Sequence, residues 1–133
     1  MQNNREFVKL PESELRLMQA LWTLEAQGDS AVTAAALMEA DSYLGSLKLT
    51  TVLTLISRLQ GRGFLSAEKK GRANCYTSLI AESDYRAQAA ADFVATVCRR
   101  QPGSLLAALV DGGTLSEQEI AELRAMLDRV QKK

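Results

Sequence analysis

Six basic side chains in one short segment are the residues best suited to bind another molecule. Residues 44–80 carry six Lys or Arg residues against one acidic residue, Glu68, so this segment has a net charge of +5. Each such cation can neutralise a nucleic-acid phosphate and release its condensed counterions. Charge alone favours the alternative explanation, a solvated surface, so the structural context of the cations must decide. The six are Lys48, Arg58, Arg62, Lys69, Lys70 and Arg72.

The net charge of the whole chain conceals this segment. The 133 residues include 16 Lys+Arg and 16 Asp+Glu, so the net charge is zero at pH 7. Residues 1–43 hold three basic and seven acidic groups, and residues 81–133 hold seven basic and eight acidic groups. The surplus positive charge is therefore confined to residues 44–80, which is the distribution expected of a footprint on a polyanion.

Catalytic chemistry has few candidates in this sequence. The absence of histidine excludes Ser-His-Asp and Cys-His nucleophiles and His-ligated zinc. Cys75 and Cys98 are far apart and form no CxxC motif, so we interpret them as reduced thiols. We therefore expect no enzyme, no cofactor and no metal. The N-terminus has no signal-peptide h-region, and no stretch reaches the ~18 apolar residues of a membrane span, so we expect a cytoplasmic protein with no membrane partner.

The helix that begins the positive segment is ambiguous in propensity but not in spacing. Residues 49–56 are rich in β-branched side chains, which favour a strand. The apolar residues nevertheless recur at helical spacing, so we predict an amphipathic helix over 48–61. Its predicted apolar stripe is Leu49, Val52, Leu55, Ile56 and Leu59, and its predicted outer face is Thr50, Thr51, Thr54 and Arg58.

A β-hairpin with a basic tip follows this helix. Two short extended runs, 64–68 and 74–79, flank a glycine-containing turn at 69–72. Before the positive segment we predict a helix that begins at residues 11–14 and ends at residues 27–30, followed by an extended piece at 30–32. A brief helix over 34–40, capped by Thr33, and a turn or loop at 41–46 come next. After it we predict helices over 84–100 and 104–110 and a last helix introduced by a capping box at 116–119.

This order predicts a fold that is mainly α with a small β-hairpin wing: a winged helix-turn-helix over 1–80, followed by a helical dimerisation domain over 81–133. In a winged helix the third helix fits the major groove and the hairpin reaches neighbouring phosphates. Because the six cations fall on those two elements, DNA binding explains their clustering. The C-terminal helices carry apolar residues that a twofold-related copy can bury. These are Phe93, Val97, Leu105, Leu106, Leu109, Leu123, Met126 and Leu127.

Five segments of the sequence have a distinctive pattern: LRLMQALW at 15–22, TTVLTLISRL at 50–59, GFL at 63–65, GRANCY at 71–76 and LSEQEIAEL at 115–123. Through these segments the sequence resembles the penicillinase-repressor (BlaI/MecI/CopY) family of winged-helix regulators over most of its length. The resemblance implies a bacterial homodimeric transcriptional repressor that binds a pseudo-palindromic operator of double-stranded DNA and dimerises through its C-terminal helices. It also implies recognition positions at Lys48, Thr50, Thr51 and Thr54, and phosphate contacts at Arg58, Lys69, Lys70 and Arg72.

Two departures from the family limit what the resemblance implies about induction. Its penicillinase repressors carry a cleavable Asn-Phe bond, and the corresponding pair here is Ala108-Leu109. A regulatory protease is therefore an open partner rather than an expected one. The copper-responsive branch carries a C-terminal cysteine cluster, whereas this chain ends at 128–133 without cysteine, so we do not expect copper sensing by that route. The competing function is a winged-helix protein-interaction module that docks on an acidic partner.

Overall fold

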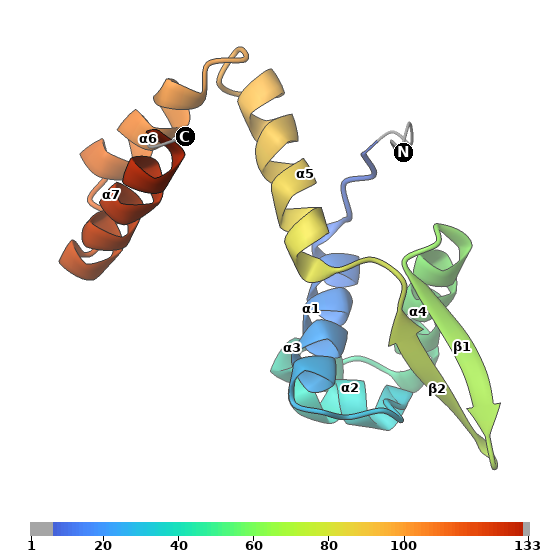
Figure 1. The fold of residues 1–133 in the computed structure, drawn as a ribbon. Coiled ribbons are helices and arrows are strands. Elements are labelled where there is room, and N and C mark those ends of the chain that lie inside the picture. Colours follow the sequence, from blue (N-terminus) through green and yellow to red (C-terminus); the bar gives the residue numbers. More distant parts are fainter. Residues whose placement is uncertain (1–6, 132–133) are drawn as a thin grey trace. The chain divides into compact units, whose positions relative to one another are not determined.

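The computed structural model describes residues 7–131, which form two compact units. The first unit ends at Ala89 and the second begins at Ala90. The elements are α1 (Glu12–Ala26), α2 (Ala34–Ala40), α3 (Ser42–Gly45), α4 (Leu49–Gly61), β1 (Leu65–Lys70), β2 (Ala73–Ser78), α5 (Glu82–Thr96), α6 (Pro102–Asp111) and α7 (Glu117–Gln131), as Figure 1 shows.

The core of the first unit surrounds α1. This helix contacts α2, α4 and β2, and its inner face is fully buried. Val32 pairs with Tyr76 in an isolated antiparallel bridge, which confirms the predicted extended piece at the edge of the hairpin. The buried apolar residues of this core are Leu10, Leu17, Met18, Ala20, Leu21, Trp22, Val32, Leu37, Leu44, Val52, Leu55, Ile56, Leu59, Phe64, Leu65, Tyr76 and Tyr85.

Two predicted helix caps are confirmed. The Thr33 hydroxyl accepts a hydrogen bond from the Ala36 N–H at 3.1 Å and opens α2. At α7 the Ser116 hydroxyl accepts from the Glu119 N–H at 3.1 Å, while the Glu119 carboxylate accepts from the Ser116 N–H at 2.9 Å. These reciprocal bonds satisfy N–H groups that have no partner within the helix.

The predicted turn or loop at residues 41–46 was wrong, because this segment contains the short helix α3. Asp41 caps it: its carboxylate accepts from the Leu44 N–H at 3.0 Å. Leu44 is fully buried, so tertiary packing stabilises a helical turn that its sequence spacing did not indicate.

The hairpin confirms the predicted wing, with a shorter turn than expected. β1 and β2 pair antiparallel from Leu65 opposite Ser78 to Lys70 opposite Ala73, so Lys69 and Lys70 belong to a strand. Gly71 has φ +65°, a conformation that suits the first central position of a two-residue hairpin loop and favours glycine. Figure 1 shows the hairpin tip extending away from the helices of its unit.

The first half of α5 belongs to the core of the first unit. The Leu10 N–H donates to the Tyr85 hydroxyl at 3.0 Å, and the Tyr85 ring lies next to the rings of Trp22 and Phe64. The Trp22 indole N–H donates to the Ile80 carbonyl at 2.8 Å, which confirms Trp22 as a core residue. The compact unit therefore extends beyond residue 80, where we predicted the change between functional domains.

The predicted end of this helix was wrong by several residues. α5 ends at Thr96 rather than at residue 100. Arg99 and Arg100 have left-handed backbone conformations, with φ of 51° and 66°, so a helix cannot continue through them. α6 then begins at Pro102, earlier than predicted. Proline suits the first turn of a helix, where its missing N–H would have no partner.

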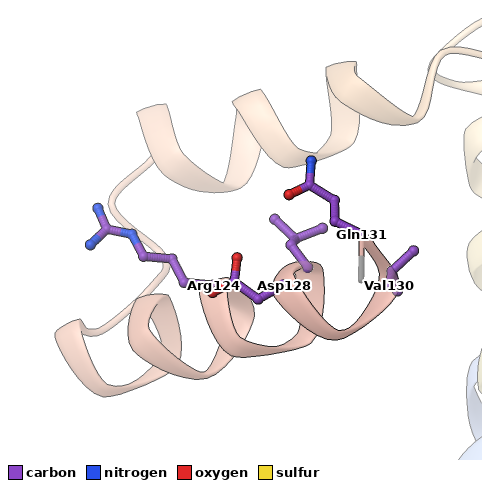
Figure 2. A pocket seen from close by; sticks show the side chains of 5 residues that line it. Arg124, Asp128, Val130 and Gln131 are labelled. Atoms are coloured by element: carbon purple, nitrogen blue, oxygen red, sulfur yellow. The ribbon is translucent and has the colours of Figure 1, made fainter. Parts of the chain in front are cut away.

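The second unit has no buried core among its described residues. α6 and α7 follow one another through a short connection and lie alongside each other (Figures 1 and 2). No residue of either helix is buried, although both are amphipathic. Their apolar faces thus remain largely accessible in the single chain.

Candidate nucleic-acid interface

Helix α4 presents one apolar and one polar face. Val52, Leu55, Ile56 and Leu59 are buried against the core, as predicted. Thr50, Thr51, Thr54 and Arg58 are exposed on the other side. The prediction was wrong for Leu49, which lies at the edge of the packed face and is 52% exposed. A threonine-rich helical surface is therefore available to an external partner.

The hydroxyl groups on this face are not equivalent. The Thr54 hydroxyl donates to the Thr50 carbonyl at 3.0 Å, one turn earlier in α4. Its hydrogen is thus engaged within the helix, which leaves its lone pairs and its methyl group for an external partner. Leu53 is exposed as well, and so is Ser57, one turn after it, which was not among the predicted contacts.

Five of the six predicted cations are exposed and have no salt bridge with another residue of the 7–131 range. Lys48 directly precedes α4, without a side-chain capping hydrogen bond, and Arg58 lies in the last turn of the helix. Lys69 and Lys70 end β1, and Arg72 follows Gly71 in the turn. The structure thus places these cations on α4 and on the wing of the same compact unit.

Arg62 differs from the other five, because its guanidinium forms an ion pair with the Glu14 carboxylate. The Glu14 side chain is only 2% exposed, whereas that of Arg62 is 39% exposed. The pair connects α1 to the residue that follows α4. Helical periodicity could not find this partner, since 48 positions separate the two residues.

A second carboxylate of α1 holds the base of the wing. Glu25 accepts hydrogen bonds from the Ser78 N–H at 2.8 Å and from the Ser78 hydroxyl at 2.6 Å. Ser78 ends β2. Helix α1 therefore contacts the end of α4 through Glu14 and the end of the wing through Glu25.

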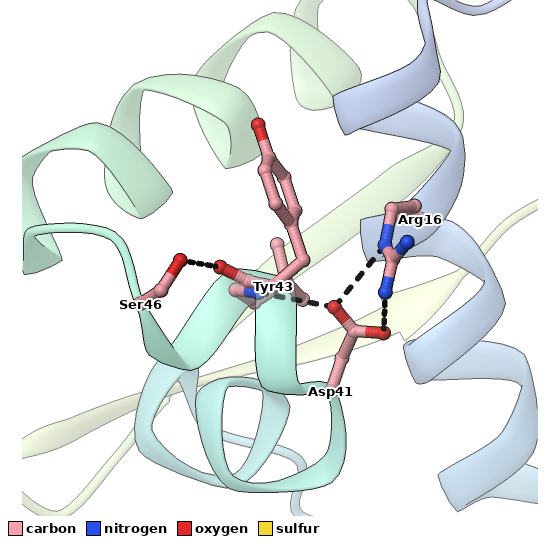
Figure 3. Close-up of polar contacts among 5 residues, drawn as sticks. Arg16, Asp41, Tyr43 and Ser46 are labelled. Atoms are coloured by element: carbon pink, nitrogen blue, oxygen red, sulfur yellow. Dashed lines mark hydrogen bonds and ion pairs between the residues drawn. The ribbon is translucent and has the colours of Figure 1, made fainter.

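A third polar contact joins α1 to the segment before α4, as Figure 3 shows. The Arg16 guanidinium donates to Asp41 at 2.9 Å and lies 5.2 Å from the centre of the Tyr43 ring. Burial raises the pKa of Asp41, but the hydrogen bonds from Arg16 and from the Leu44 N–H lower it more, so the net pKa is below its ordinary value. Asp41 thus remains ionised and fixes the start of α3.

The predicted dimerisation residues lie in the second unit and remain accessible. Phe93, Val97, Leu106, Met126 and Leu127 are exposed. Leu105, Leu109 and Leu123 are half-buried. Val110 and Val130, which we had not included, are exposed as well. Figure 2 shows the C-terminal end of α7, where Arg124, Leu127, Asp128, Val130 and Gln131 line a hollow of about 370 Å³.

No group of three or more metal-ligating side chains occurs within residues 7–131. Cys75 is buried in the hairpin, and Cys98 is half-buried after α5. In the described part of the chain, no helix is long and apolar enough to cross a membrane.

In the first unit, helices α1, α2 and α4 and the short helix α3 pack together with a two-stranded hairpin, and α4 exposes a polar face. This arrangement defines a winged helix-turn-helix protein. The predicted fold class, mainly α with a hairpin wing and a helical C-terminal region, is confirmed. The chain belongs to the penicillinase repressor family, whose model matches residues 10–129. The family consists of repressors, so membership also confirms the prediction of a binding protein rather than an enzyme.

Individual relatives match different lengths of this chain. The methicillin resistance regulatory protein MecI of Staphylococcus aureus is 35% identical over 79 residues, which are 59% of this chain and 64% of that protein. The penicillinase repressor of Bacillus licheniformis is 25% identical over 124 residues, or 93% of each chain. The solution structure of the DNA binding domain of the repressor BlaI has a TM-score of 0.48 and 27% identity, over 61% of this chain and 93% of that one. Among the relatives that are 35% to 38% identical to this chain, the matched region covers only 53% to 64% of the relative's own length.

Proposed function

We propose that this protein is a homodimeric, cytoplasmic transcriptional repressor that binds an inverted-repeat operator in double-stranded DNA. The observation that carries the proposal is the joint exposure of the outer face of α4 and of five cations without a salt bridge to another described residue. None of these side chains belongs to the buried core. Both features fit a duplex, because a major groove about 12 Å wide admits a helix while a wing contacts the phosphates beside it.

In the proposed complex, the residues of α4 and of the wing have different roles. Thr50, Thr51 and Thr54 face the base edges from α4, and Lys48 lies at its start. Arg58 and the wing cations Lys69, Lys70 and Arg72 contact phosphates, which position the protein without reading sequence. Arg62, which we also predicted at the interface, acts through its pair with Glu14 and holds α4 in place.

The proposed dimer interface is the apolar surface of the second unit. The proposal is supported by the absence of any buried residue in the described parts of α6 and α7, although both carry large apolar side chains. A twofold-related copy can cover such a surface with the same surface of its own. In this proposal, residues 1–80 bind DNA and residues 81–133 form the dimer. Tyr85 and its neighbours are the exception, because they pack in the first unit.

Operator symmetry tests the proposed function directly. DNA selected by the full chain from a random pool is expected to show a pseudo-palindrome whose half-sites are about one helical turn apart or a multiple of it. Footprinting of the selected sequence should protect both half-sites. Failure to enrich any sequence, together with binding to an acidic protein surface, would favour the alternative function, a protein-interaction module.

Oligomeric state tests the dimer separately. Leu127→Glu places a charge on the exposed apolar face of α7, so this variant is expected to sediment as a monomer at micromolar concentrations at which the unmodified chain is a dimer. Ala125→Glu is the matched control, since Ala125 is also exposed on α7 but has little apolar surface. A dimer that survives Leu127→Glu and also survives truncation after Ala89 would place the interface in the first unit.

A further inference from the structure

We infer that Leu53, with Leu49 one turn before it, reads the 5-methyl groups of thymine in the operator. The inference rests on the proposed DNA binding and adds the base that the apolar part of α4 recognises. Its starting observation is the exposure of two large apolar side chains on the helix that carries the candidate contacts. Leu53 is 40% exposed and Leu49 is 52% exposed.

The exposed leucines are not part of the core packing of α4. The four core residues of this helix are almost completely inaccessible, and they already fill its inner face. Leu49 and Leu53 are four positions apart, so they lie one above the other on the helix surface. Leu53 also lies beside Thr50, three positions earlier on the same helix.

The hydrogen bond within α4 makes this part of the surface still less polar. Because the Thr54 hydroxyl donates to the Thr50 carbonyl, it has no hydrogen to donate to a base. The leucines and the threonine methyl group therefore offer C–H surface, while cationic groups lie at the start of α4, Lys48, and in its last turn, Arg58. A purely cationic helix surface would be suited to phosphates, whereas α4 carries a cation near each end and exposed apolar side chains between the two along its length.

Thymine is the partner whose chemistry matches such a surface. In the major groove the C5-methyl of thymine is the apolar group among the base edges, and the other groups there are hydrogen-bond donors and acceptors. Phosphates and sugars offer no equivalent methyl group. An apolar side chain positioned between phosphate-binding cations thus distinguishes thymine from cytosine, and from a thymine analogue that lacks the methyl group.

Replacement of thymine by deoxyuridine tests the inference, because it removes the methyl group and keeps every base-pairing atom. The probe is the duplex that the full chain selects from a random pool, with each thymine replaced singly. At one or more positions, the affinity of the unmodified chain is expected to fall about four-fold, the factor for burial of one such carbon. Leu53→Ala should lose this sensitivity at the same position, and Leu53→Met should retain it.

Leu79→Ala is the matched control, because Leu79 is an exposed leucine of the same unit outside α4. This variant should respond to deoxyuridine as the unmodified chain does. Specific binding that no deoxyuridine substitution changes, or equal sensitivity in the Leu53→Ala and Leu79→Ala variants, would overturn the thymine assignment and leave the proposed function intact. Failure to select any DNA sequence would overturn the proposed function and this inference with it.

Discussion

The buried carboxylate of Glu14 in α1 and the guanidinium of Arg62 after α4 form an ion pair across the core of the first unit. Glu25, on the same helix, accepts two hydrogen bonds from Ser78 at the end of the wing. Helix α1 carries no predicted DNA contact, yet it holds both elements that we propose to bind DNA. Through Glu14 and Glu25, α1 thus contacts the residue that follows α4 and the last residue of β2.

Arg62→Ala is expected to destabilise the first unit, because it leaves the Glu14 carboxylate buried without its partner. The expected loss in free energy of unfolding is about 2 to 3 kcal/mol, less than for a fully buried pair because Arg62 is partly exposed. Urea denaturation measures this loss. Arg58→Ala, an exposed control on α4, should cost less than about 0.5 kcal/mol. Equal losses in the two variants would show that the Glu14–Arg62 pair contributes nothing specific.

Asp41→Asn is expected to change how stability depends on pH. The pKa of Asp41 is lower in the folded chain than in the unfolded chain, so the ionised form favours folding at pH values above the unfolded pKa. This contribution disappears as the pH falls through the lowered pKa. Asparagine caps a helix about as well as aspartate, so the substitution removes the charge and keeps the cap.

Thermal unfolding between pH 2 and pH 6 measures this effect. The difference in stability between the unmodified chain and Asp41→Asn should be present near pH 6 and should vanish at the acidic end. Asp29→Asn is the control, since Asp29 is exposed and forms no salt bridge with another described residue. A difference that stays constant across the range would contradict the role of Asp41 ionisation.

Lys70→Ala is expected to weaken binding to all DNA sequences by a similar factor. Loss of one phosphate contact should reduce the magnitude of the slope of log affinity against log salt by about 0.9. Lys9→Ala is the matched control, since Lys9 is an exposed lysine outside the positive segment. Titrations at several salt concentrations should also show little change in slope for Arg62→Ala. A Lys70→Ala slope equal to that of the Lys9→Ala control would remove Lys70 from the interface.

Substitutions at Thr54 separate its methyl group from its hydroxyl. Thr54→Val keeps a methyl and loses the hydroxyl, whose hydrogen already bonds within α4. Thr54→Ser keeps the hydroxyl and loses the methyl. We expect the Thr54→Val variant to keep operator affinity within about two-fold of the unmodified chain. The Thr54→Ser variant should lose about four-fold in affinity, the effect of one buried methyl group. The opposite order in binding titrations would show that the hydroxyl, rather than the methyl, contacts the DNA.

The Thr51→Ala variant should alter base preference at a different base pair from the one that Thr54 contacts.

The sequence by itself determined the features that depend on neighbouring residues. Helical spacing identified α1, α2 and α4, short polar motifs identified the caps at Thr33 and Ser116, and glycine between two extended runs identified the wing. Charge distribution identified the segment that we propose to bind DNA. These signals are local, because a helix face or a tight turn is encoded within a few positions.

Tertiary structure decided which of these local features contact one another. It paired Glu14 with Arg62 and Glu25 with Ser78, formed α3 around the buried Leu44, and attached Tyr85 to the first unit. It also left Leu49 and Leu53 exposed, since the width of the buried stripe on α4 depends on how much of that helix the rest of the core covers. Spacing defines a helix face, but packing between distant segments decides how much of that face remains available to a partner.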